Sequence, residues 1–402
     1  MGSLAEQLIR VPDLVRKLTI ADLQNVVFRA KLRRAGILGK AGVVGQKALR
    51  RIKAAALAIR ALQMYGSAVQ QKYGVSLSDQ FIQLLLVTVL RGYRADDYYR
   101  YRMYRDIVAA SSFVPVQLHM DIRRQLYEML QLKATALADK RIFYHTCAEK
   151  DLCVPETLAD FDRGSVRWWG KAQLPHVSLF SKEAASLSGA GASLWIYIGA
   201  NRWRDITGTV LDESTLISLL CKGSQAAPLL LQRQVENHPD LADLGPSGLC
   251  TVRVVTIRHP MGMTPEILIA SFRIPAVGGV ADNFSTGGTA CPVDLDTGVL
   301  GPGVRKDLHF AHLDLFQCPD TGVPIAGRVL PCWSSALTLA LKTHSIFPEY
   351  PSVGWDIAIT PTGPVLIEGN YNWGSSLVQQ AGCRPLGETQ YTEHMFAWAR
   401  TV

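Results

Sequence analysis

One segment, VGWDIAITPTGPVLIEGN at residues 353–370, restricts the fold more than any other part of the chain. Two alternating apolar runs flank the sequence TPTG, which contains strong turn formers. Pro361 suits the second position of a turn because its φ is already fixed, and Gly363 suits the left-handed position that follows. The segment therefore predicts a β-hairpin with a three-residue loop, in which Thr360 pairs with Pro364.

The predicted register brings three oxygen-bearing side chains together. Counting back along both strands sets Asp356 opposite Glu368, and Asn370 shares the face of Glu368 because side chains alternate along a strand. Magnesium prefers oxygen ligands, and burying unpaired carboxylates is unfavourable. We therefore predict a metal site formed by Asp356, Glu368 and Asn370, with a solvated sheet face as the alternative. The opposite face is predicted to join the core through Val353, Trp355, Ile357, Ile359, Val365 and Ile367.

This stretch resembles the C-terminal motif of ATP-grasp enzymes, in which an Asp on one strand and Glu-x-Asn on the next hold the Mg²⁺ ions that bridge ATP phosphates. The sequence GWDIAIT…GPVLIEGN is similar to the same motif in the sugar-transfer-associated, α-L-glutamate-ligase-like branch of these enzymes. The resemblance covers roughly residues 137–385. It implies an α+β ATP-grasp fold, with two α+β subdomains gripping ATP, preceded by a mainly helical N-terminal region. ATP and two Mg²⁺ ions are the implied cofactors, with Mn²⁺ as an alternative metal.

The resemblance also assigns phosphate contacts further upstream. Lys140, in ADKRIFYHT, matches a phosphate-contacting lysine, and Lys182 matches a second lysine before a Gly-rich loop. Gly189 and Gly191 in that loop would let backbone N–H groups approach an anion closely. The family usually has Lys-Pro at the second position, whereas here Glu183 follows the lysine. A solvated lysine and an ordinary flexible turn are the alternatives.

The strand LLLQRQV, residues 229–235, corresponds to the hinge that lines the adenine in the family. On this resemblance Gln232 and Val235 are the implied adenine contacts and Glu236 a ribose contact. Any strand end of similar composition would look alike, so the register is left open.

Two arginines complete the predicted site. Arg253 lies within the β-branched strand TVRVVTI, and a buried arginine needs an anionic partner. It matches the strand arginine that contacts the transferred phosphoryl group. Arg273 and Asn283 match an Arg…Asn…Gly-Gly segment that lies beside the γ-phosphate and the acceptor. A salt bridge to a neighbouring acid and a Gly-rich surface loop are the respective alternatives.

The secondary-structure pattern changes near residue 136. Before it, Ala-rich and Leu-rich segments predict helices at 47–66 and 76–93, with Ser78 as an N-terminal cap and Gly66 and Gly92 at helix ends. After it, short β-branched runs predict strands with helices between them. The predicted strands are 229–235, 249–257, 266–274, 353–359 and 364–370, and the predicted helices are 215–223 and 335–344.

The chain of 402 residues favours more than one sub-structure. We predict three parts, the first basic and mainly helical, the second an ATP-grasp N-terminal subdomain with the Gly-rich loop and hinge, and the third a C-terminal subdomain with the Mg²⁺ site. Their boundaries are 1–135, 136–235 and 236–402.

Residues 1–105 contain 19 Lys/Arg and 6 Asp/Glu. Because the basic residues stand at helical spacings, a helical region whose basic face meets solvent or an acidic partner is favoured over a site for nucleic acid or an anionic membrane. A homodimer surface and the docking of an anionic carrier or polysaccharide remain open. The Tyr- and Arg-rich stretch 94–107 predicts a charged helix that packs its tyrosines on a neighbour, with stacking on a nucleotide base as the alternative.

No segment of the sequence resembles a secretory signal. The most apolar stretch, FIQLLLVTVL, is shorter than the roughly 20 residues that a transmembrane helix needs. A cytoplasmic protein without a transmembrane segment is therefore predicted.

The function implied by the resemblance is an ADP-forming carboxylate–amine ligase. A small-molecule carboxylate would attack the γ-phosphate to give an acyl phosphate, and an amine would then form the amide. The family name points to specialised-metabolite or polysaccharide biosynthesis. The alternatives are an ATP-grasp kinase that phosphorylates a hydroxyl, and a basic binding module with a degenerate ATP site.

Overall fold

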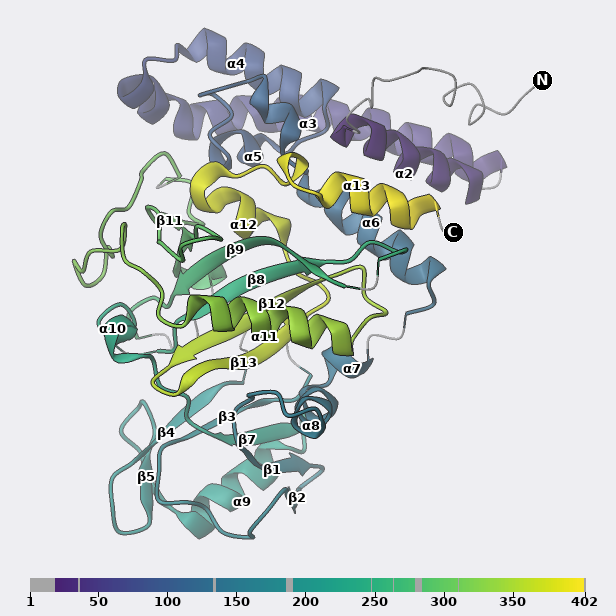
Figure 1. Cartoon of the computed structure of the whole chain (residues 1–402). Helices are drawn as coiled ribbons and strands as arrows, with labels where there is room; N and C mark the ends of the chain where they lie inside the picture. Colours follow the sequence, from purple (N-terminus) through teal and green to yellow (C-terminus); the bar gives the residue numbers. More distant parts are fainter. Residues whose placement is uncertain are drawn as a thin grey trace.

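The computed structural model places three layers one after another (Figure 1): a group of helices, a six-stranded sheet flanked by helices, and a small lobe built on a seven-stranded sheet. It describes residues 19–34, 37–132, 135–185, 191–246, 248–262, 264–278, 284–309 and 311–400. The predicted α+β arrangement, with a helical region before it, is confirmed.

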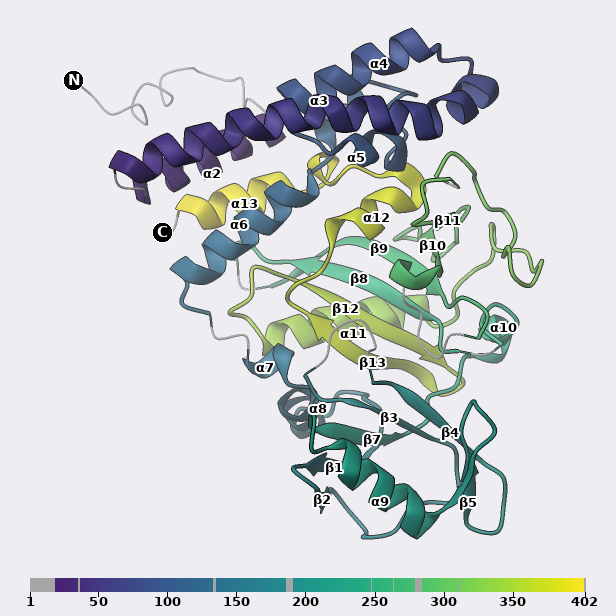
Figure 2. The same cartoon turned by 180° about the vertical axis from the view of Figure 1, so that it is seen from behind.

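Helices form the described part of the N-terminal region. The long α3 and α2 lie across the top of the molecule, and α6 runs down beside the C-terminal helix α13 (Figures 1 and 2). The elements are α2 (Ile20–Arg34), α3 (Ile37–Tyr73), α4 (Leu77–Leu85), the π-helical turn η1 (Leu86–Leu90), α5 (Ala95–Arg100), η2 (Ala109–Ser112) and α6 (Val116–Met129). Two further helices, α7 (Thr135–Ala138) and α8 (Lys140–Glu149), follow this region and precede the small lobe.

Two of the predicted helix ends are wrong. Ser76, not Ser78, caps α4, because the Ser76 side chain accepts a hydrogen bond from the Asp79 backbone N–H. Gly66 lies inside α3, where a Cβ would come within 2.8 Å of the Leu77 side chain, so close helix packing explains this glycine. Gly92, with φ +77°, does end its helix as predicted.

The Tyr- and Arg-rich stretch packs inward, as the structural prediction requires. Tyr98, Tyr99, Tyr101 and Tyr104 are each at most 4% exposed, which leaves no ring face free for a nucleotide base. Arg102 lies among them with φ +51° and reaches out of the helical region. Its guanidinium donates to the carbonyl oxygens of residues 311 and 313 at 2.8 and 2.7 Å and contacts the Asp314 carboxylate. The helical region is thereby attached to the long loop between two elements of the six-stranded layer, β11 (Val304–Arg305) and α11 (Trp333–Ile346).

The small lobe is an antiparallel sheet with α9 on its outer face. Ala159, Phe161, Leu216 and Leu220 belong to its separate apolar core, while the opposite face looks toward α8. The strand order is β2-β1-β7-β3-β4-β5-β6. The elements are β1 (Thr157–Asp162), β2 (Ser165–Trp168), β3 (Leu179–Glu183), β4 (Ser193–Tyr197), β5 (Arg202–Arg204), β6 (Val210–Asp212), α9 (Glu213–Gly223) and β7 (Leu229–Arg233).

The second sheet has the order β11-β10-β9-β8-β12-β13 and is covered on both faces. Helix α11 packs on one face, and α6, α12 and α13 cover the other (Figures 1 and 2). The elements are α10 (Pro239–Ala242), β8 (Thr251–Ile257), β9 (Glu266–Ile274), η3 (Phe284–Thr286), β10 (Thr289–Pro292), β11 (Val304–Arg305), α11 (Trp333–Ile346), β12 (Ser352–Thr360), β13 (Gly363–Asn370), α12 (Ser375–Gln380), η4 (Ala381–Cys383), η5 (Leu386–Glu388) and α13 (Tyr391–Arg400).

The hairpin of β12 and β13 is confirmed, but its turn is one residue shorter than predicted. Thr360 pairs with Gly363 rather than Pro364, so the loop holds two residues. A β-bulge at Ile367 then adds one residue to β13 and restores Asp356 opposite Glu368.

The predicted core face of β13 is wrong for the same reason. Leu366 is fully buried, whereas Val365 and Ile367 are only partly buried. The two register errors cancel at the end of the hairpin where the polar residues stand.

The predicted boundaries at 135/136 and 235/236 remain predictions. In the part of the chain that the structure describes, no helix is long and apolar enough to cross a membrane.

Candidate active site

Three neighbouring strands carry the centre of the site. Arg253 on β8 lies directly opposite Asp356 on β12, and Arg273 on β9 lies opposite Thr251 on β8. All four side chains therefore share one face of the sheet, the face away from α11. Gly354 makes room for this arrangement, since a Cβ there would come within 2.8 Å of Cδ of Arg253.

The Asp356 carboxylate is the hub of the hydrogen bonds. The guanidinium of Arg253 contacts both of its oxygens, with Nη2 3.0 Å from Oδ2. Nη2 of Arg273 lies 2.8 Å from Oδ2, and Nδ2 of Asn370 donates to the same atom at 3.2 Å. Burial alone would raise the pKa of Asp356, but the charges of the two arginines outweigh it and hold that pKa below its ordinary value. Asp356 is therefore an anion in the folded protein.

Glu368 faces the same space from the edge strand β13 and is more open than Asp356. Its side chain is 29% exposed, against 8% for Asp356, and its Oε2 lies 3.9 Å from Nζ of Lys140. Lys140 is the first residue of α8, which packs beside the small lobe. This helix therefore places a lysine next to the strand that carries Glu368.

Tyr144, one turn after Lys140 on α8, completes the contact. Nζ of Lys182 on β3 donates to the Tyr144 hydroxyl at 2.5 Å, and this hydroxyl donates to the Ile367 carbonyl oxygen at 2.5 Å. The predicted phosphate lysines Lys140 and Lys182 thus lie near Glu368. The site holds four basic residues and two acidic ones, so its basic side chains outnumber its carboxylates, which suits an anionic ligand.

Raising the pH above about 7 is expected to stabilise the protein through Lys182. Burial lowers the pKa of this lysine to about 7, with Glu368 opposing the shift and Lys140 adding to it. The unfolded chain keeps the ordinary value of 10.5, so between these values it binds more protons than the folded chain. The free energy of unfolding then rises with pH by up to about 1.4 kcal/mol per unit. Urea unfolding of the wild type and Lys182→Met across this range checks it, and equal slopes would contradict it.

The side-chain oxygen atoms at this site are the kind of ligand that a hard cation such as Mg²⁺ prefers. Glu368 offers a carboxylate that is open to solvent, and Asn370 keeps its amide oxygen because its nitrogen faces Asp356. Asp356 accepts three hydrogen bonds on Oδ2 and one from Nε of Arg253 on Oδ1, so Oδ1 is the less occupied of its two oxygens. Among the described residues, His, Cys, Asp and Glu side chains form no group of three that could hold a metal by themselves. A cation here would thus need further ligands from water or phosphate, as Mg²⁺ commonly has.

Among the residues that the structure describes, the others predicted to contact the nucleotide form no hydrogen bond or ion pair with the Asp356 carboxylate. Gln232 is buried on β7 and donates to the Thr157 hydroxyl at 2.9 Å. Val235 and Glu236 follow the end of β7, with Val235 partly buried and Glu236 exposed. Gly191, with φ +70°, lies against the Glu183 side chain. Gly189 and Asn283 lie outside the described residues, and all of these assignments remain predictions.

Sequence reasoning did not select Tyr144 or Thr251. The Thr251 hydroxyl accepts hydrogen bonds from Nε of Arg273 at 3.1 Å and from Nη2 at 2.5 Å, and these bonds hold the guanidinium beside Asp356. Tyr144 could have been found, because a residue four positions after Lys140 on a helix shares its face. Nothing in the pattern around Thr251 marks it, since its role depends on the pairing of β8 with β9.

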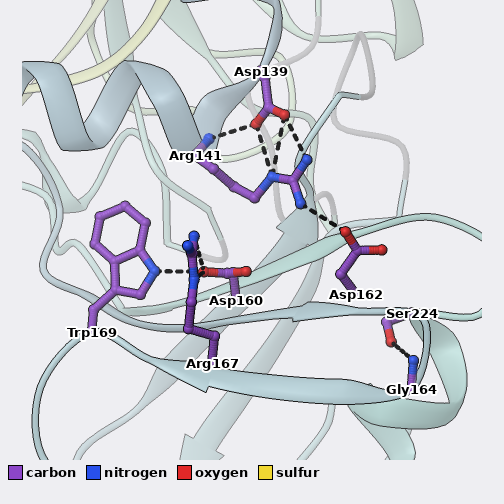
Figure 3. A network of polar contacts seen from close by, with 8 residues as sticks. All are labelled: Asp139, Arg141, Asp160, Asp162, Gly164, Arg167, Trp169 and Ser224. Atoms are coloured by element: carbon purple, nitrogen blue, oxygen red, sulfur yellow. Dashed lines mark hydrogen bonds and ion pairs between the residues drawn. The ribbon is translucent and has the colours of Figure 1, made fainter.

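A cleft of about 830 Å³ is lined by the start of α8 and by the β1–β2 hairpin. Its charged groups satisfy one another (Figure 3): Arg141 binds Asp139 and Asp162, and Arg167 contacts the Asp160 carboxylate, which also accepts from Trp169 Nε1 at 2.7 Å. This network fixes the start of α8, and hence Lys140, relative to the β1–β2 hairpin.

The two sheets and the charged cluster define an ATP-grasp protein. Residues 122–392 match the sugar-transfer associated ATP-grasp family. The chain belongs to this family, which confirms the resemblance found in the hairpin and extends it at both ends. Comparison with curated protein sequences gave no match.

Solved structures of ATP-grasp ligases are among the similar folds. A purK N5-carboxyaminoimidazole ribonucleotide synthetase in complex with ADP matches at 13% identity over 60% of this chain and 46% of its own, with a TM-score of 0.36. D-alanine–D-alanine ligase from Bacillus anthracis matches at 11% identity over 66% and 69%, with a TM-score of 0.37. The ligase PsnB with minimal precursor, Mg and ADP matches at 11% identity over 66% and 60%, with a TM-score of 0.33. The chain spans less than half of the first of these relatives.

Proposed function

We propose that this protein is an ATP-dependent carboxylate–amine ligase that releases ADP and phosphate. The observation that carries the proposal is the cluster of Arg253, Arg273 and Asp356 beside Glu368 and Lys140. Family membership supports the use of ATP. The substrates proposed are a small-molecule carboxylate and a small-molecule amine, in specialised-metabolite or polysaccharide biosynthesis.

The residues present have the charges that phosphoryl transfer requires. Lys140 and Lys182 neutralise phosphate oxygens from the small-lobe side of the site. Arg253 and Arg273 are held rigidly by Asp356, so they stabilise charge that develops on the transferred group without having to reorganise. A substrate carboxylate attacks the γ-phosphate to form an acyl phosphate and ADP. An amine then attacks the acyl carbon and displaces phosphate.

Glu368 and the Asn370 oxygen, with Oδ1 of Asp356, are the residues that would hold Mg²⁺ ions. When bound, the metal supplies positive charge to the β- and γ-phosphates. Besides contributing Oδ1 to the metal, Asp356 would orient the guanidinium groups of Arg253 and Arg273.

A kinase is the second candidate, because the same cluster would serve transfer of phosphate to a hydroxyl. Steady-state assays separate the two. ADP release that requires both a carboxylate and an amine supports the ligase, whereas release with an alcohol alone supports the kinase. A protein that binds no ATP would be the basic binding module instead.

Glu368→Gln is expected to lower ADP release about 100-fold, because it removes a charged ligand while keeping the side-chain shape. Its free energy of unfolding should change little, since the side chain is 29% exposed. ADP and phosphate release from Mg-ATP, measured with a panel of carboxylates and amines, checks the expectation.

Glu349→Gln is the matched control, because Glu349 is an exposed carboxylate outside the cluster. It should retain full activity. Equal activity of Glu368→Gln and the wild type would rule out the proposed metal site.

A further inference from the structure

Tyr144 is fully buried at the contact between α8 and the edge strand β13. Its single hydroxyl proton is directed to the Ile367 carbonyl oxygen, 2.5 Å away. The hydroxyl oxygen in turn accepts from Nζ of Lys182, also at 2.5 Å, and Nζ lies 4.8 Å from the centre of the Tyr144 ring. One side chain therefore links the lysine on β3 to the backbone of β13.

The partner on β13 is available because of the bulge. Ile367 is the extra residue of β13, so it has no opposite residue on β12. A bulged residue leaves backbone groups unpaired in the ladder, and buried backbone groups need partners. The Tyr144 hydroxyl supplies one to the carbonyl of the residue that immediately precedes Glu368.

We propose that Tyr144 is a positioning residue that holds the ammonium group of Lys182 in register with Glu368 and Asn370. The inference rests on the proposed function, in which Lys182 binds phosphate and β13 carries metal ligands. Lys182 comes from the small lobe and Glu368 from the six-stranded sheet, so their separation depends on how the two parts meet. The hydrogen-bonded chain from lysine to hydroxyl to carbonyl fixes that separation at the bulge.

A purely structural role is the competing explanation. The Tyr144 ring packs in the apolar core with Phe143, at 5.4 Å between ring centres, and beside Cys147. Such packing would stabilise the fold whether or not Lys182 is present. The two roles are separated by asking whether the effect of the hydroxyl on ATP binding requires the lysine.

The experiment measures ATP affinity by calorimetry for the full chain as wild type, Tyr144→Phe, Lys182→Met and the double variant. Tyr144→Phe keeps the ring, so its thermal unfolding is followed in parallel to verify the fold. We expect Tyr144→Phe to weaken ATP binding about 10-fold in the wild-type background, the loss typical of a hydrogen bond to a charged group. In the Lys182→Met background the same change should weaken binding less than about twofold.

Tyr93→Phe is the matched control. Tyr93 is also a buried tyrosine, with its hydroxyl 2.6 Å from the Phe113 carbonyl oxygen, but it lies in the helical region. It should alter stability and leave ATP affinity unchanged. Should Tyr144→Phe not fold, Tyr144→Met provides a second variant without a hydroxyl.

The outcomes separate this inference from the proposed function. Equal losses in both backgrounds, or no loss in a wild type that binds ATP, would overturn the positioning role alone. A wild type that binds no ATP would overturn the proposed function and this inference with it.

Discussion

Asp356→Ala is expected to lower the free energy of unfolding by about 3–5 kcal/mol and to abolish ATP-dependent turnover. The reason is that Arg253 and Arg273, only 9% and 8% exposed, would both lose the carboxylate that neutralises them. Two like charges would then remain buried side by side. Urea unfolding followed by circular dichroism gives the stability, and ADP release gives the activity.

Asp243→Ala is the surface counterpart of this substitution. Asp243 also makes two contacts with an arginine, Arg328, but its side chain is 48% exposed. Exposed pairs contribute roughly 0–1 kcal/mol, so this variant should be nearly as stable as the wild type. If Asp356→Ala loses no more stability than Asp243→Ala, the buried cluster is not an electrostatic unit.

Arg102→Ala is expected to lower the free energy of unfolding by about 2–4 kcal/mol, from the loss of three hydrogen bonds that include a charged partner. Arg102 is 4% exposed and joins the helical region to residues 311–314. The measurement is urea unfolding combined with hydrogen exchange of that loop, which should exchange faster in the variant.

Arg105→Ala provides the comparison, because Arg105 lies three residues further on and is exposed. Its loss should be within about 0.5 kcal/mol of the wild type. Unchanged exchange of residues 311–314 in Arg102→Ala would show that the helical region is held by other contacts.

The sequence correctly predicts that Asp356, Glu368 and Asn370 share one face of the hairpin, but through a register that differs from the observed one. The observed turn is one residue shorter, and Glu368 lies opposite Asp356 only because the bulge at Ile367 offsets that difference. The bulge at Ile367 coincides with a tertiary contact, the hydrogen bond that the Tyr144 hydroxyl donates to the Ile367 carbonyl oxygen. Local residue preferences do not reveal such a contact, and the loop predicted from them is one residue longer than the observed loop.

The partners of the charged residues were only partly predictable. A buried Arg253 required an anion, and the alternatives of phosphate and a neighbouring acid were both open. The structure provides the acid, Asp356, while the basic side chains of the cluster still outnumber its carboxylates. Arg273 and Thr251 meet because β8 and β9 pair in one register, which the separate strand patterns do not specify.

Arg102 is not the sole contact between the helical region and the six-stranded layer among the described residues, because α6 also packs on the sheet face opposite α11. Leu118, Ile122 and Leu126 of α6 belong to the same apolar core as Val255 and Ile257 of β8. The Gln379 side chain closes the junction by accepting from the Val114 N–H at 2.8 Å and donating to its carbonyl at 3.0 Å.

A chain that started at residue 136 would present this apolar face to water, and we expect it to aggregate. A helical region taken from a relative is therefore expected to replace this one only if its α6 face fits the sheet beneath it.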